Sequence, residues 1–350
     1  MSNQLSRRNF VKSATLLPFA AAAIGGMGSA LSAMAEQPIQ RVGGSNLKVS
    51  INAYSFTGIL PQTHEDQTIG ASMPLPTPAN ETPKKQKKGT RKGGQKMTLF
   101  DLVDFCSKNN IDGCDPTGYF FPTYPTPPSD DYLNTLKRHA FELGVGISGT
   151  GVRNNFTTMD KSLRDYSVQK IKNWVEVAAK LGAPVLRVFC DTQIRSMTWH
   201  DVAPNCTREQ VRDWIIADLK ECTAHGERFG IIIGVQNHGD FLQTGDQVIE
   251  LVQGVDSDWC GAIVDTGYFN HTPDPYAEMA KVAPYAVNWQ VKQSPWGEDS
   301  NVPMDLVKML QIVRSSGYCG YLPIETLESD PQVAVPAMVK KLRDAIAQTA

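Results

Sequence analysis

The chain has 350 residues, of which 41% are hydrophobic and 20% charged, and its formal net charge is −2 at pH 7. These values are typical of a globular protein with a sizeable core, and the mildly acidic balance argues against a nucleic-acid partner. The 7 cysteines are scattered, without C-x-x-C or zinc-finger spacing. We therefore expect small core residues and no disulfide framework.

Residues 1–35 have the features of an export signal. Arg7 and Arg8 form a twin-arginine pair, a mildly apolar run follows, and Ala-Met-Ala at 33–35 supplies a cleavage site. The alternative is a basic start to an ordinary helix. The apolar run is shorter than the roughly 20 residues that span a bilayer, so no stable membrane anchor is expected. The sequence predicts a soluble protein exported by the twin-arginine route to the periplasm or another extracytoplasmic compartment.

The first strand is predicted at residues 49–56, and an unusual segment at 58–96 follows it. This segment is rich in Pro, Thr, Gly and Lys and has almost no large apolar residues, which predicts a disordered insertion. Basic residues outnumber acidic ones within it. It is therefore either a solvated loop or a basic flap over an acidic mouth.

From Met97 onward, helical and strand patterns alternate. Thr98 is the predicted N-cap of the first helix, and strands are predicted at 111–119, 145–151, 185–190, 231–238, 261–265, 287–292 and 321–325. Further helices are predicted at 130–143, 163–181, 207–229, 246–252, 276–282, 303–315 and 331–348. Eight alternating strands and helices predict one α/β domain over residues 36–350, a closed (β/α)8 TIM barrel. An open doubly wound sheet is the alternative, although no G-x-G-x-x-G follows the first strand.

The last four strands each carry a polar residue near the C-terminal end, where active sites of such barrels lie. Alternation along each strand points these side chains to one face; they are Gln236, Asp265, Gln290 and Glu325. Two carboxylates and two amide oxygens are hard ligands suited to Mg²⁺ or Mn²⁺. The alternative is a hydrogen-bonded polar plug without a metal.

Two further residues are candidate acids or bases. His238 lies two residues beyond Gln236 and Lys292 two beyond Gln290, so both are expected at the mouth above the metal. Candidate substrate-binding residues at other strand ends and loops are Asp115, Arg153, Arg187, Tyr268 and Trp296. The two arginines and Asp115 are equally compatible with structural ion pairs.

The strand ends together resemble a known family. The sequence is similar to the xylose isomerase-like TIM barrels, which include sugar isomerases, epimerases and endonuclease IV. The segments that carry the similarity are QNHG at 236–239, VDTGYF at 264–269, VNWQVK at 287–292 and a last strand ending in Ile-Glu. The resemblance covers about residues 48–348 outside the insertion. It implies a divalent metal held by Glu, Asp, His and Glu from strands five to eight, at positions occupied here by Gln236, Asp265, Gln290 and Glu325.

Two of these four positions depart from the family pattern. Two-base epimerases of the family use the glutamates of strands five and eight, and the Gln236 amide cannot act as a base. Glu325 is then the remaining catalytic carboxylate, and His238 or Lys292 must supply a second acid or base.

The resemblance implies a metal-assisted isomerase or epimerase that acts through an enediolate on a keto-sugar or related small carbohydrate. A keto-glycoside lyase or hydratase and a non-catalytic carbohydrate-binding barrel are the alternatives. An endonuclease IV-like function is disfavoured, because that metal site is rich in histidine and this chain has few near its strand ends.

Overall fold

The computed structural model describes residues 37–63, 96–194, 197–297 and 300–350. Residues 35–350 form a single compact unit. The predicted export signal and residues 64–95 of the insertion lie outside the described residues, so both stay predictions. Within the described part, no helix is both long and apolar enough to span a bilayer.

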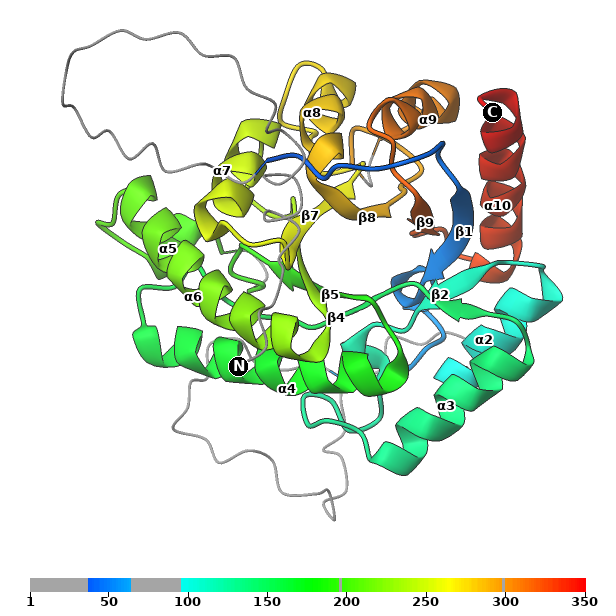
Figure 1. The fold of residues 1–350 in the computed structure, drawn as a ribbon, viewed down its shortest axis with the longest axis horizontal. Helices are drawn as coiled ribbons and strands as arrows, with labels where there is room; N and C mark the ends of the chain where they lie inside the picture. The colour runs from blue at the N-terminus through cyan, green and yellow to red at the C-terminus, as the bar shows by residue number, and fades with distance from the viewer. Residues whose placement is uncertain (1–36, 64–95, 195–196, 298–299) are drawn as a thin grey trace, which may run out of the picture. The chain divides into compact units, whose positions relative to one another are not determined.

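Short parallel strands form the inner ring of a barrel (Figure 1). They are β1 (Leu47–Asn52), β2 (Gly113–Asp115), β3 (Gly146–Ile147), β4 (Thr150–Gly151), β5 (Val185–Phe189), β6 (Ile232–Gln236), β7 (Cys260–Asp265), β8 (Ala286–Gln290) and β9 (Gly320–Ile324). Hydrogen bonds join them in the orders β3-β2-β1-β9 and β4-β5-β6-β7-β8. The two sheets meet where Val291, just after β8, pairs in parallel with Ile324 of β9. The predicted (β/α)8 barrel is confirmed.

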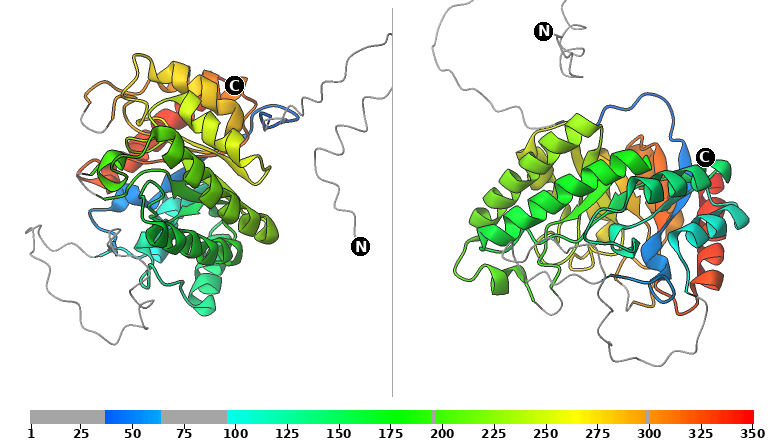
Figure 2. Two further views of the ribbon diagram at one scale, coloured as in Figure 1. Left: turned by 90° about the vertical axis from the view of Figure 1, so that its left-hand side faces the viewer. Right: turned by 90° about the horizontal axis from the view of Figure 1, so that it is seen from below.

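Helices form the outer ring, as Figure 1 and the side views of Figure 2 show. They are α2 (Leu99–Lys108), α3 (Asp130–Glu142), α4 (Lys161–Leu181), α5 (Trp199–Val202), α6 (Arg208–Phe229), α7 (Gly245–Val255), α8 (Pro275–Val282), α9 (Leu306–Ser315) and α10 (Pro331–Gln348). Thr98 caps α2 as predicted, in a capping box with Asp101. The short helix α5 was not predicted.

The predicted first strand, 49–56, is wrong in its second half. β1 ends at Asn52, whose side chain accepts a hydrogen bond of 2.8 Å from the Tyr54 N–H. This bond caps a 3₁₀ helix, η1 (Ala53–Phe56), because an Asn side chain can replace the next strand hydrogen bond. The predicted strand at 111–119 is likewise shortened to β2 and followed by a 3₁₀ helix, η2 (Gly118–Phe120).

The predicted strand at 145–151 is divided into β3 and β4. β3 pairs with β2, whereas β4 pairs with β5, so the chain changes partner at Ser148 and Gly149. A Cβ atom at Gly149 would lie 3.1 Å from the Asn288 amide nitrogen and 3.3 Å from a carboxylate oxygen of Asp115. The barrel interior therefore leaves little room for a side chain at this change of partner.

The core includes large aromatic side chains and most of the cysteines predicted for it. Trp289 is fully buried, and its ring centroid lies 6.1 Å from that of Tyr318. All seven cysteines are free, and those at 106, 114, 190, 222 and 260 are buried. At the two ends of the insertion, the Met97 N–H donates to the Ile59 carbonyl at 3.1 Å. The described ends of the insertion are therefore joined by a backbone hydrogen bond.

Candidate active site

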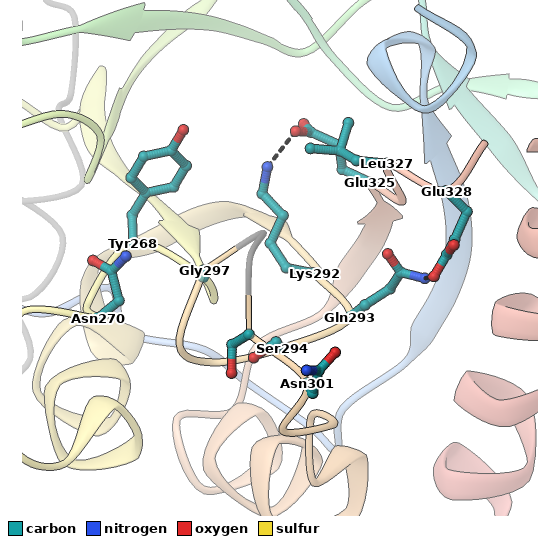
Figure 3. A pocket seen from close by; sticks show the side chains of 12 residues that line it. Tyr268, Asn270, Lys292, Gln293, Ser294, Gly297, Asn301, Glu325, Leu327 and Glu328 are labelled. Carbon is teal, nitrogen blue, oxygen red and sulfur yellow. Dashed lines mark hydrogen bonds and ion pairs between the residues drawn. The ribbon is translucent and has the colours of Figure 1, made fainter. Parts of the chain in front are cut away.

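A polar cavity of about 400 Å³ opens where the chain leaves β7, β8 and β9 (Figure 3). Three predicted site residues line it, Tyr268, Lys292 and Glu325. Loop residues that the sequence analysis did not identify also line it, among them Asn270, Gln293 and Glu328. The cavity lies at the C-terminal ends of the strands, where the active sites of such barrels are found.

Lys292 joins two carboxylates at one side of this cavity. Its Nζ donates a hydrogen bond to Glu325 Oε1, drawn as a dashed line in Figure 3, and lies 3.6 Å from Asp265 Oδ2. All three side chains are buried. Burial lowers the pKa of Lys292, but the charges of Asp265 and Glu325 outweigh burial and raise that pKa above its usual range. The lysine is therefore a permanent cation at neutral pH.

The turn after β7 positions the backbone and the side chain of Lys292. The Lys292 N–H donates to Thr266 Oγ1 at 2.9 Å, which fixes the backbone at the end of β8. A Cβ atom at Gly267 would lie 2.9 Å from Lys292 Cγ, so the absent side chain leaves the space that the lysine stem fills. The DTG sequence thus supplies one carboxylate and the room for its partner cation.

The two glutamines meet Asp265 as strand alternation predicts. Gln236 Nε2 donates to Asp265 Oδ2 at 2.7 Å, and Gln290 is the partner of Asp265 in the β7–β8 register. The carbonyl oxygen Oε1 of each glutamine is buried and has no hydrogen-bond donor. Burial raises the pKa of Asp265, and the charge of Lys292 opposes that rise. The Gly267 N–H also donates to Asp265 Oδ1, at 3.0 Å.

A divalent metal ion does not fit this donor arrangement, although the two unpaired amide oxygens would suit a cation. Lys292 was predicted above the metal, but its ammonium lies between the two carboxylates that would bind the ion. Two unit charges 4 Å apart interact by about 4 kcal/mol at the effective dielectric constant of protein sites, and a divalent ion doubles this repulsion. Among the described residues, no group of three or more His, Cys, Asp or Glu is placed to hold a metal.

His238 belongs to a second polar group beside the cavity. Its Nδ1 lies 2.6 Å from Asp191 Oδ2, and its ring centroid lies 4.2 Å from that of Tyr268. The Tyr268 ring is also 5.4 Å from Lys292 Nζ, so one tyrosine lies next to both predicted acid or base groups. A carboxylate bonded to one imidazole nitrogen orients the ring and fixes its tautomer.

Asp191 was not predicted from the sequence, although it lies two residues beyond the end of β5 and a strand-end rule would have identified it. Gln193 Nε2 donates to its other oxygen at 2.7 Å. Gly239, with a φ of +73°, comes so close that a Cβ atom there would lie 2.5 Å from the Asp191 side chain. The glycine of QNHG is therefore required for the approach of Asp191 to His238.

Asp115 and Arg187 form a further buried ion pair, whose charges interact with that of Glu325. Arg187 Nη1 lies 3.8 Å from Asp115 Oδ2, and Nη2 donates to Thr117 Oγ1 at 3.4 Å. Burial raises the pKa of Asp115, which the Arg187 charge opposes. Arg153 lies over the Tyr119 ring, with Cζ 4.7 Å from its centroid.

Asp115, Arg187, Arg153 and Trp296 are not among the described residues that line the cavity, and Trp296 is 38% exposed. Their roles in substrate binding stay predictions. Buried Nε atoms of Arg153 and Arg187 without hydrogen-bond partners show that both guanidiniums keep donor capacity.

Fold and site define a (β/α)8 barrel whose polar cavity lies at the strand ends, the architecture of many enzymes that act on small molecules. The family model described as "Xylose isomerase-like TIM barrel" matches residues 103–347. The chain belongs to this family, as the strand ends predicted. No curated protein sequence matches the chain.

Solved structures share the fold at low sequence identity. The 3-keto-D-glucoside 4-epimerase YcjR from E. coli is 13% identical with a TM-score of 0.58, over 71% of this chain and 94% of that one. A D-tagatose 3-epimerase-like protein is 20% identical with a TM-score of 0.57, over 72% and 95%. The IolI protein, solved with a zinc atom, is 14% identical with a TM-score of 0.60, over 86% and 97%. At least one protein of this fold therefore holds a divalent metal.

Proposed function

We propose that the chain is a sugar isomerase or epimerase-like enzyme that removes a proton from the carbon next to the carbonyl of a small keto-sugar. The observation that carries this proposal is the buried Glu325–Lys292 pair, which lines a polar cavity at the strand ends. Similarity to proteins named as sugar epimerases supports the substrate class, and one of these names specifies a keto-glucoside.

Each residue of the pair has a distinct task. Glu325 takes the proton as general base, and the electron pair of the broken C–H bond moves into the sugar to give an enediolate. The Lys292 ammonium donates to the sugar oxygen on which negative charge develops, where a buried cation stabilises the transition state most. Because its pKa is raised, Lys292 suits this electrostatic role better than it suits proton transfer.

The cavity is suited to a sugar by size and chemistry. Its volume of about 400 Å³ is in the range of small-molecule sites. The amide side chains of Asn270, Gln293 and Asn301 line it and can pair with hydroxyl groups as donors or acceptors. The enediolate then collapses to the isomer or epimer when a proton returns to carbon.

A lyase or hydratase acting on a keto-glycoside is the second candidate function. It is favoured by the Asp191–His238 pair, at 2.6 Å, because an oriented imidazole can protonate a leaving group while Glu325 removes the proton from carbon. One face of the sugar then suffices, and no base is needed at Gln236.

Proton exchange tests the proposed function. Keto-sugars and keto-glycosides are incubated with the protein in D₂O, and deuterium at the carbon next to the carbonyl is followed by NMR. We expect incorporation that Glu325→Gln slows by at least about 10²-fold, the usual scale for a general base. The control Glu227→Gln changes an exposed glutamate on α6 and should exchange like wild type. Sugar binding without exchange would instead indicate a non-catalytic binding barrel.

We also propose that the protein is exported by the twin-arginine route, as Arg7, Arg8 and the Ala-Met-Ala site suggest. Replacing both arginines with lysine should hold the precursor in the cytoplasm, measured by fractionation and immunoblotting. Normal export of that variant would assign the segment to the general secretory route.

A further inference from the structure

We propose that the ammonium of Lys292 takes the place of the divalent cation at this site, so that the chain supplies its own positive charge and needs no divalent metal. The inference rests on the proposed function only in taking the ammonium to face a sugar oxygen. Its test measures metal binding, which requires no substrate.

The contacts of Lys292 are those expected of the site's cation. Its Nζ bonds to Glu325 Oε1 and lies 3.6 Å from Asp265 Oδ2, so it joins the two anionic groups that the resemblance assigns to the metal. The Tyr268 ring faces the same Nζ at 5.4 Å, an additional contact that favours a cation there. One monovalent cation between two carboxylates leaves a local charge of −1, whereas an added divalent ion would make it +1.

Neighbouring residues are arranged for the lysine and against an ion. Gly267 leaves space for the lysine stem, and a Cβ atom there would be 2.9 Å from Cγ. Both oxygens of Asp265 already accept hydrogen bonds, from Gln236 Nε2 at 2.7 Å and from the Gly267 N–H at 3.0 Å. A divalent ion would have to displace the ammonium and compete with these donors for Asp265.

The neutral side chains of Gln236 and Gln290 also support this inference. A neutral amide adds no negative charge, so Gln236 and Gln290 leave Asp265 and Glu325 as the two anions beside the lysine. Glutamates at these positions would bind a divalent ion far more strongly. The two departures from the family pattern and the position of Lys292 therefore have one explanation.

Metal binding of the full-length protein tests the inference. Wild type and Lys292→Ala are purified, equilibrated with about 1 mM MnCl₂, desalted and analysed for manganese, and their melting is compared with and without MnCl₂ and EDTA. Wild type should retain well under about 0.1 manganese per chain, with melting unaffected by either reagent. Lys292→Ala frees two carboxylates and two amide oxygens, so it should bind manganese at least about 10-fold more tightly than wild type and melt higher in MnCl₂.

Two controls make the result specific. Lys340→Ala removes an exposed lysine that is also paired with an aspartate, at 2.6 Å, and should bind no manganese. Asp265→Asn combined with Lys292→Ala removes a ligand and should lose the binding gained by Lys292→Ala. If Lys292→Ala folds only with manganese present, that dependence supports the inference.

Two results would overturn it. One is about one manganese per chain in wild type, removed by EDTA with a fall in melting temperature. The other is a folded Lys292→Ala that binds manganese no better than wild type. Neither result depends on deuterium exchange into a sugar, so a failure of the proposed function would be seen separately.

Discussion

The Lys292 ammonium donates a hydrogen bond to the Glu325 carboxylate between the ends of β8 and β9, and both side chains are buried at the wall of the cavity. A paired carboxylate and ammonium have complementary roles in enolisation, because one accepts a proton as the other stabilises the oxygen that becomes negative. The proposed reaction therefore depends on the contact between Lys292 and Glu325.

Lys292→Met should destabilise the protein by roughly 3–5 kcal/mol at pH 7, the scale for breaking a buried ion pair, because two carboxylates lose their buried cation. The folded pKa of Lys292 is raised, so its stabilising effect is fully present below the unfolded pKa of about 10.4 and is lost only as pH rises through the higher folded value. Urea unfolding of wild type and variant between pH 7 and 11 measures the difference. A difference that shrinks between pH 7 and 9 would show that burial lowers the pKa instead.

His238→Asn should lower turnover by about 10-fold, less than Glu325→Gln, because the imidazole oriented by Asp191 can no longer act as the second acid or base. The matched control is His139→Asn, which breaks another His–Asp pair, 2.7 Å long, between α3 and α2. Full activity in His238→Asn would remove this histidine from the mechanism.

Gly267→Ala should lower turnover by about 10²-fold, because its Cβ would lie 2.9 Å from Lys292 Cγ and move the ammonium. Gly44→Ala is the control, since no atom lies within 4 Å of a Cβ built there. Melting temperatures distinguish a displaced lysine from a damaged fold. Wild-type turnover in Gly267→Ala would mean that the lysine stem is not held by this turn.

Replacing residues 64–95 with a short Gly-Ser linker should lower the melting temperature by less than about 5 °C, because the ends of the insertion are already joined by the Met97–Ile59 hydrogen bond. Differential scanning calorimetry provides the measurement. A larger loss would show that the insertion packs on the barrel. Lost activity with retained stability would support the basic flap.

The fold could be predicted because segments with the hydrophobic period of a strand alternate with segments that have the period of a helix. Turn residues separate these segments along the chain. Element ends depended on single side chains, as at Asn52, where one hydrogen bond to Tyr54 replaces the predicted end of a strand. β3 and β4 pair with different strands, and Gly149 between them lies close to Asn288, a residue far away in sequence. Propensity and periodicity contain no information about such contacts.

For the candidate site, the sequence could predict which face of its strand each residue occupies. The alternation of side chains along each strand correctly placed Gln236 beside Asp265 and Lys292 on the same face as Gln290. This alternation does not show how far a long side chain extends into the barrel. The sequence therefore placed Lys292 at the mouth, whereas its ammonium lies between carboxylates. Cavity residues such as Asn270 and Gln293 lie on irregular loops, where the sequence has no period to read.

The most direct measurement of the central claim is the rate of deuterium exchange into a keto-sugar by wild type and Glu325→Gln, followed by NMR in buffer freed of divalent metals. The account predicts exchange by wild type that EDTA does not slow, and a loss of at least about 10²-fold in Glu325→Gln. Equal exchange by the two proteins would contradict the assignment of Glu325 as the base.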